Sequence, residues 1–150
     1  MRDLGLLLLR IIVGGIFMAH GYPKVFGGPD KPVHPKARQY LGQGFEAAMG
    51  RGGMDQFGQS LAGMGFPMPK VMAWPGALAE LVGGALLILG WLTRPAALAL
   101  SVNMAIAIGH VHRKNGLMGQ GGFELALALL GSLLALILGG PGAISIDGDE

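Results

Sequence analysis

The chain has 150 residues, of which 51% are apolar and only 13% are charged, and its net charge is +2. A soluble domain carries about 25% charged residues, so the composition excludes an ordinary soluble domain and favours one membrane-embedded domain over residues 1–150. The absence of cysteine excludes thiol catalysis, disulfides and cysteine-ligated metal centres. Because the basic residues form no dense patch, nucleic-acid binding is not expected.

The first apolar segment, residues 4–25, is long enough for a membrane helix, which needs about 20 residues. Arg10 interrupts its apolar core, and no small-x-small cleavage site follows before Gly21 and Tyr22. We therefore interpret this segment as a retained membrane helix and not as a cleaved signal peptide.

A connection over residues 26–70 follows, rich in glycine, proline and charge. Within it, residues 35–49 and 54–64 predict two short amphipathic helices that lie on the membrane surface. A disordered loop is a close alternative for residues 35–49, because the glycines there weaken a helix. In residues 54–64 the helical spacing of Phe57, Leu61 and Met64 favours a helix.

Three further apolar segments predict membrane helices over residues 71–92, 96–112 and 123–138. The segments 71–92 and 96–112 are joined by a tight turn in which Pro95 is suited to begin a helix. The segment 123–138 ends at the glycine- and proline-rich sequence of residues 139–142. The sequence thus predicts an all-α fold, a bundle of four transmembrane helices with a long first connection that carries short surface helices.

Most basic residues fall in the first and third connections, whereas the C-terminal tail is acidic through Asp147, Asp149 and Glu150. The positive-inside rule then places both longer connections in the cytoplasm and both termini outside.

Glu80 lies near the middle of the segment 71–92. A carboxylate at that depth costs roughly 2.5–3.5 kcal/mol and is tolerated when it faces a protein interior, a partner or water. Arg10 enters from the opposite membrane face, so the sequence predicts an ion pair between Arg10 and Glu80. A purely structural role for this pair is equally compatible with the sequence, since polar contacts also hold membrane helices together.

Helical spacing gives each span one face of small and polar residues, the pattern of a four-helix bundle with a polar centre. The faces are Arg10, Gly14, Phe17, Gly21 and Lys24 on the first span; Gly76, Glu80, Gly83 and Leu87 on the second; Asn103, Ala107 and His110 on the third; and Glu124, Ala128, Gly131 and Ala135 on the fourth.

Two groups of candidate site residues follow from these faces. The candidate catalytic residues are Glu80 and His110, and the candidate ligand-binding residues are Arg10, His20, Lys24 and Asn103. For Asn103 a role in holding helices together is favoured, and His112 and Glu124 are expected to be solvated at the interface. Haem ligation by His20 and His110 is disfavoured because nothing in the local sequence specifies haem, and no metal site is predicted.

Several stretches of the chain resemble the DoxX-like family of small integral membrane proteins. The first is Leu9-Arg10-Ile11 with Gly14 and His20-Gly21-Tyr22-Pro23-Lys24, similar to the first-helix signature of that family. The others are residues 62–69 leading into Glu80-Leu81-Val82-Gly83-Gly84, residues 89–95, Met104, residues 110–112, and the closing residues 139–147. The resemblance covers nearly the whole chain in order and departs mainly over residues 30–53, where many relatives have a shorter connection.

The resemblance implies a four-helix, multi-pass protein of the bacterial or archaeal cytoplasmic (inner) membrane. Family members are similar to small subunits of quinone-linked oxidoreductases, such as thiosulfate:quinone oxidoreductase, and others are thought to help assemble redox complexes. A quinone is therefore the candidate cofactor. The family supplies no agreed catalytic residues, so whether the chain is itself an enzyme stays open.

Three functional hypotheses remain. In the first, the chain is an accessory redox subunit whose polar core binds a quinone, with Glu80 relaying protons. In the second, it is a non-catalytic scaffold or assembly factor that docks a protein partner on residues 30–53. In the third, it is a small-solute or proton transporter, which the lack of an inverted repeat disfavours. Small-residue faces also suggest a homodimer within the lipid bilayer.

Overall fold

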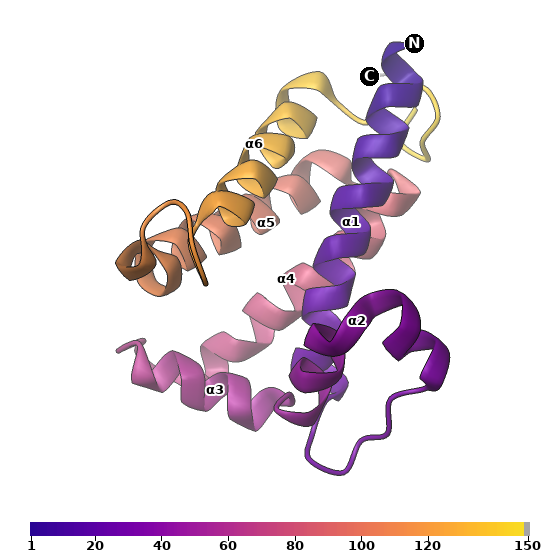
Figure 1. Cartoon of the computed structure of the whole chain (residues 1–150). Helices are drawn as coiled ribbons and strands as arrows, with labels where there is room; N and C mark the ends of the chain where they lie inside the picture. The colour runs from indigo at the N-terminus through magenta and orange to yellow at the C-terminus, as the bar shows by residue number, and fades with distance from the viewer. Residues whose placement is uncertain (149–150) are drawn as a thin grey trace. The chain divides into compact units, whose positions relative to one another are not determined.

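A computed structural model describes residues 1–148 and, for His112, the backbone alone. Asp149 and Glu150, counted above with the acidic tail, lie outside the described residues. The described residues form six α-helices and contain no β-strand, as Figure 1 shows. The predicted all-α class is confirmed.

Three helices of the described part are long and apolar enough to cross a membrane. They are α1 (Arg2–Phe26), α4 (Pro69–Leu89), and α5 (Thr93–Ile106) together with the π-helical turn that continues it to Val111. The last helix, α6 (Glu124–Gly139), is apolar but has 16 residues. At 1.5 Å per residue it is about 24 Å long, shorter than a hydrocarbon core of about 30 Å. Three of the four predicted spans therefore have the length of a transmembrane helix.

The connection between α1 and α4 is helical rather than disordered. It contains α2 (Pro35–Gly50) and α3 (Met54–Gly63), so the loop alternative for residues 35–49 is wrong. At Gly42 the backbone leaves the helical region with φ of 81°, which divides α2 into two arms. Glycine adopts this conformation without the steric penalty that other residues meet.

The chain divides into two compact units. One contains Met1–Ile16 and the chain from Val82 onward, and the other contains Phe17–Leu81. The helices α1 and α4 each contribute one part to each unit.

In the first unit α1 and α4 approach closely at Gly14. A Cβ added to Gly14 would lie 2.5 Å from the Gly84 carbonyl oxygen and 2.8 Å from Cγ1 of Ile88. Small residues allow membrane helices to approach in this way. The neighbouring core residues Val13 and Leu87 are 2% and 0% exposed, so the predicted faces of the first two spans are the packed ones.

The predicted inward faces of the last two spans need correction. On α6 the buried residues are Ala126, Leu129, Leu133 and Leu136, whereas the predicted face of Glu124, Ala128, Gly131 and Ala135 is exposed. On α5 the buried residues are Thr93, Ala96, Ala97, Leu100, Ser101 and Met104, while Asn103 is half-buried and His110 exposed. Leucines fill the space between these helices, so a polar centre contributed by all four spans is not what the described residues form.

The C-terminal segment folds back and caps α5. The Asp147 carboxylate accepts hydrogen bonds from the backbone N–H groups of Leu92 and Thr93, each at 2.9 Å. Leu92, at the N-cap with φ of 49°, has no side chain that can cap the helix. Asp147 therefore supplies from a distant part of the chain the acceptor that a local Ser or Asp would normally provide. Its own N–H donates to the Gly90 carbonyl at 2.8 Å.

Arg10 is held beneath this segment. Its side chain is 0% exposed, and its guanidinium donates a hydrogen bond to the Ile144 carbonyl. The charges of Arg10 and Asp147 attract one another. Near the start of α1, Asp3 accepts a hydrogen bond from the Ala143 N–H at 3.2 Å. The buried Arg10 guanidinium is thus bonded to a backbone carbonyl and attracted by a carboxylate of its own unit.

We predict that Gly90→Ala destabilises the protein by about 2–4 kcal/mol. Gly90 has φ of 66°, and a Cβ there would overlap the Arg10 guanidinium. Gly131→Ala is the control, because a Cβ at Gly131 meets nothing within 4 Å. Thermal unfolding in detergent micelles measures both. Equal midpoints for the two variants would contradict the packing of Arg10 against Gly90.

We also predict a pH dependence that arises at Asp147. Partial burial raises the pKa of Asp147, but hydrogen bonds from the N–H groups of Thr93 and Leu92 outweigh it and hold the pKa below its usual value. The carboxylate then contributes stability above its unfolded-state pKa of about 3.9, and this stability is lost as pH falls through the lower folded-state pKa. Unfolding midpoints measured across the acid range should show this loss in the wild type, and a smaller one in Asp147→Asn.

Candidate functional site

The buried carboxylate of the second unit forms an ion pair with Lys24. Glu80 is 6% exposed in the middle of α4, and both of its carboxylate oxygens accept hydrogen bonds from Lys24 Nζ at 2.6 Å. Of the three settings expected to tolerate this carboxylate (a protein interior, a partner or water), the structure shows the protein interior. The predicted pairing of Glu80 with Arg10 is wrong, because Lys24 is the partner of Glu80 and Arg10 bonds to Ile144.

A close approach of α1 to α4 explains this pairing. A Cβ added to Gly21 would lie 2.6 Å from the Leu81 nitrogen and 2.9 Å from the Glu80 Cβ. With no side chain between them, the two backbones come close enough for a lysine to reach the carboxylate. Lys24 follows Gly21 by three residues and therefore lies on the same face of α1.

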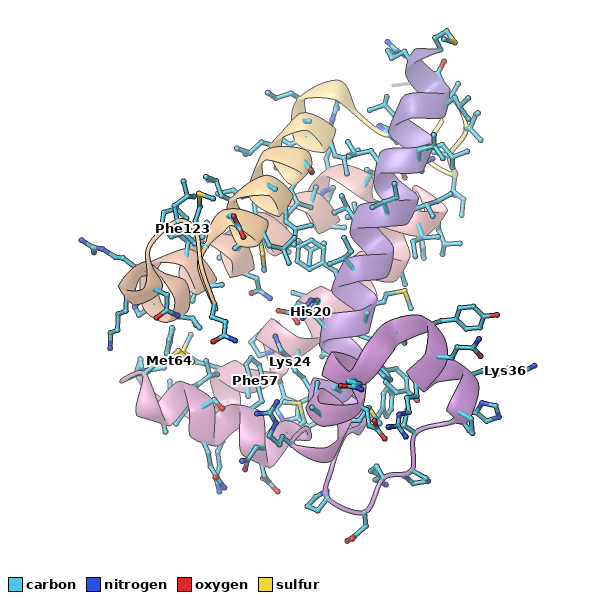
Figure 2. The ribbon with its side chains drawn as sticks, viewed as in Figure 1. His20, Lys24, Lys36, Phe57, Met64 and Phe123 are labelled. Carbon is cyan, nitrogen blue, oxygen red and sulfur yellow. The ribbon has the colours of Figure 1, made fainter. Side chains whose placement is uncertain are left out.

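Phe57 of α3 contributes an aromatic face to the ion pair. The Lys24 Nζ lies 4.6 Å from the centroid of the Phe57 ring, a distance at which a cation is attracted to the ring. A Cβ added to Gly76 of α4 would meet the ring at 3.5 Å, in ordinary contact. Figure 2 shows Lys24 of α1 and Phe57 of α3 beside one another. The helical spacing of Phe57, Leu61 and Met64 predicted the apolar face of this helix but not the contact of Phe57 with the ion pair.

The two charged groups differ in exposure. The Lys24 side chain is 28% exposed and the Glu80 side chain is 7% exposed. An ammonium has three N–H donors, and the two contacts with Glu80 can account for two of them. Lys24 can therefore hold the carboxylate and offer a donor to a ligand at the same time. His20, one helical turn earlier and exposed, lies on the same side of α1 as Lys24.

The other predicted site residues belong to the first unit. Arg10 lies beneath the C-terminal segment, Asn103 is half-buried on α5, and His110 is exposed in the π-helical turn Ala107–His112. Glu124 is exposed, as expected for an interfacial residue. Residues 1–148 contain no group of three or more His, Cys, Asp or Glu that could hold a metal ion. The structure thus brings Lys24, Glu80 and Phe57 together, with His20 nearby.

We predict that the Lys24–Glu80 pair is strongly coupled. Lys24→Met leaves a buried carboxylate without its cation and should cost about 3–5 kcal/mol. Glu80→Gln leaves a partly exposed ammonium without its anion and should cost less. The double variant Lys24→Met with Glu80→Gln removes both charges and should cost much less than the sum of the single variants. Unfolding in micelles gives the free energies of unfolding of the wild type, the two single variants and the double variant, which form a double-mutant cycle. Lys114→Met, at an exposed position, is the control and should stay within about 0.5 kcal/mol of the wild type. Additive single costs would show that the pair is not coupled.

Comparison with known proteins identifies relatives of this chain, one of which is named as a membrane protein. The family model described as DoxX matches residues 5–113. "Inner membrane protein YphA" of Escherichia coli (strain K12) is 30% identical over 152 residues, an alignment that covers 97% of this chain and 90% of that protein. "Putative oxidoreductase CatD" of Bacillus subtilis (strain 168) is 32% identical over 134 residues, covering 89% of this chain and 79% of that protein.

No solved structure gives a significant match. The family model alone spans well over half of the chain, and both relatives align with most of it. The chain is therefore a membrane protein of the DoxX family.

Proposed function

We propose that this DoxX-family protein is an accessory subunit of a quinone-linked oxidoreductase complex, with the Lys24–Glu80 pair as its site. The observation that carries the proposal is a buried carboxylate bonded to a partly exposed ammonium, on two helices apolar enough to cross a membrane. Ionisable residues inside a membrane are functional candidates by default. The word oxidoreductase in the name of one relative supports a redox setting.

The residues of this site fit a quinone. A quinone is an apolar ring with two carbonyl acceptors, and when bound it supplies two-electron, two-proton redox chemistry. Lys24 would donate an N–H to one carbonyl, and the Phe57 ring would provide an apolar face beside it. Glu80 would take up and release a proton at its carboxylate while Lys24 keeps that group in position. His20 is the second donor within the same part of α1, and the electrons would come from a protein partner of the complex.

The topology belongs to the same proposal. We expect α6, with flanking residues, to cross the membrane as a fourth and shorter span, because a bilayer thins locally around a short apolar helix. The connections between α1 and α4 and between α5 and α6 carry most of the basic residues and would lie in the cytoplasm, with both termini outside.

The proposal also assigns surfaces for partners and roles for the other predicted site residues. The exposed small-residue face of α6 is where a second copy of the chain would pack. The second arm of α2 and the helix α3 are the part available to a protein partner. His110 stays a candidate proton donor of the first unit. Arg10 is assigned to holding the C-terminal segment, and Asn103 to contacts between helices.

The test is quinone binding by the protein in phosphatidylcholine nanodiscs, measured with a short-chain benzoquinone by equilibrium dialysis. The wild type should bind, and the double variant Lys24→Met with Glu80→Gln should bind at least about tenfold more weakly, the loss expected when a charged donor is removed. The double variant is the informative one because it should remain folded. Lys114→Met is the binding control.

Two results would overturn the proposal. Wild-type affinity in a folded double variant would remove the ion pair from quinone recognition and leave it a structural role. No quinone binding by the wild type, together with stoichiometric co-purification of a protein partner, would favour a non-catalytic assembly factor. The partner should then be lost when residues 30–53 are deleted.

A further inference from the structure

The first arm of α2, residues 35–41, presents an exposed apolar pair. Tyr40 is 81% exposed and Leu41 is 48% exposed. Both precede Gly42, whose non-helical backbone ends this arm of the helix. The apolar surface of an exposed tyrosine and leucine is unfavourable in water, and tyrosine is enriched where a protein surface meets a membrane interface.

The second arm of α2 fixes the helix to the end of α1. The Phe45 ring lies 6.3 Å from the ring of Tyr22, centroid to centroid. Met49 is 6% exposed, and its carbonyl accepts a hydrogen bond from the Gly28 N–H at 2.8 Å. The second arm, residues 43–50, thus forms a base that is attached to the end of α1. The first arm, residues 35–41, continues from this base.

This base lies at the end of a membrane-crossing helix. The Pro23 carbonyl, in the last turn of α1, accepts hydrogen bonds from the N–H groups of Gly27 and Gly53, each at 2.9 Å. A Cβ at Gly27 would lie 2.7 Å from Cα of Gly52, so the chain packs tightly there. Since α1 ends at Phe26, Lys31 is at most about 17 Å of extended chain from the end of the span.

The arm and the residues just before it are basic. Lys31, which precedes the arm, and Lys36 and Arg38 within it are all exposed. Arg38 is paired with Glu46 at 2.9 Å, whereas Lys36 extends outward from α2 in Figure 2. Asp30 offsets one of these charges in part. The arm thus combines an apolar pair with adjacent lysines, the combination that binds an anionic lipid surface.

We propose that residues 31–41 dock on the anionic phospholipid headgroups of the bilayer in which the protein resides. Tyr40 and Leu41 enter the interface between headgroups and acyl chains, and Lys31 and Lys36 contact lipid phosphates. Each lysine near an anionic surface strengthens docking by about fivefold. A membrane surface is favoured over a protein partner because α1 already holds this arm at the height of the headgroups, so docking needs no encounter step.

The lack of cysteine in the chain makes a site-specific test simple. A single cysteine replaces the exposed Gln39 and carries the fluorophore NBD, with Tyr40 left in place. The labelled protein is placed in nanodiscs of phosphatidylcholine alone or of phosphatidylcholine with phosphatidylglycerol. We expect a blue-shifted emission and protection from aqueous iodide in the anionic discs. High salt should weaken both effects, because at 1 M salt the attraction between exposed charges is screened beyond about 3 Å.

Charge variants separate docking from other causes. Lys31→Gln with Lys36→Gln should lower the docked-to-undocked ratio in anionic discs by about twenty-fivefold, or about fivefold for each charge, and leaves the Arg38–Glu46 pair intact. Arg113→Gln with Lys114→Gln removes the same charge from exposed positions elsewhere and should leave the ratio unchanged. Tyr40→Ser should reduce iodide protection in the anionic discs.

The opposite outcomes are equally clear. A probe at residue 39 that is quenched by iodide to the same extent in both lipids would overturn the proposal. So would equal effects of the two double charge variants. Protection that appears only when a soluble protein is added would assign the arm to a protein partner instead. None of these outcomes depends on the quinone proposal.

Discussion

A carboxylate inside a membrane helix needs a cation or a proton beside it, because no bulk water is available to solvate its charge. In this protein Lys24 meets that need for Glu80, with both oxygens at 2.6 Å. Other features of the second unit follow from this contact. The α1 and α4 backbones must approach, which Gly21 allows. The aromatic ring of Phe57 then covers the ammonium from α3.

The first unit meets the same constraint in another way. Arg10 is fully buried, and instead of a carboxylate on a neighbouring span it uses a backbone carbonyl of the C-terminal segment. That segment also carries Asp147, which caps α5. The helix cap and the buried arginine therefore depend on the same few residues at the end of the chain. Each unit ties α1 to a distant part of the sequence through one buried charge.

Local patterns predicted much of this arrangement. The apolar segments predicted the three helices that are long enough to cross a membrane, and the spacing of Arg10, Gly14, Gly21 and Lys24 predicted the packed face of α1. The partner of Glu80 was missed because two cations share that face, and residue spacing does not fix the register between helices. The contacts of Gly14 with Gly84 and of Gly21 with Glu80 set that register. They place Arg10 opposite Gly90 and Lys24 opposite Glu80.

The face of α6 was mispredicted for a different reason. This helix is apolar all round, so small residues and leucines both suit its interior side. In a membrane the hydrophobic effect does not drive helices together, and only the shape of the neighbouring helix decides which side packs. Leucines fill the contact with α5, and the small residues are left outside. Phe57 was missed as a site residue because a connection between spans carries no depth signal of its own.

The ion pair can be compared with two apolar side chains at the same positions. If holding α1 to α4 were the only requirement, two apolar side chains of similar volume would do it as well or better, because a buried ion pair loses much of its attraction to desolvation. The pair is also asymmetric, with a lysine four times as exposed as its carboxylate. A purely structural pair gains nothing from that exposure, since full burial of both groups would strengthen their attraction. Exposure of one partner is useful when a ligand has to reach the ammonium while the carboxylate remains held beside it. The unequal burial of Lys24 and Glu80 is thus the feature that favours a binding site over a structural bridge.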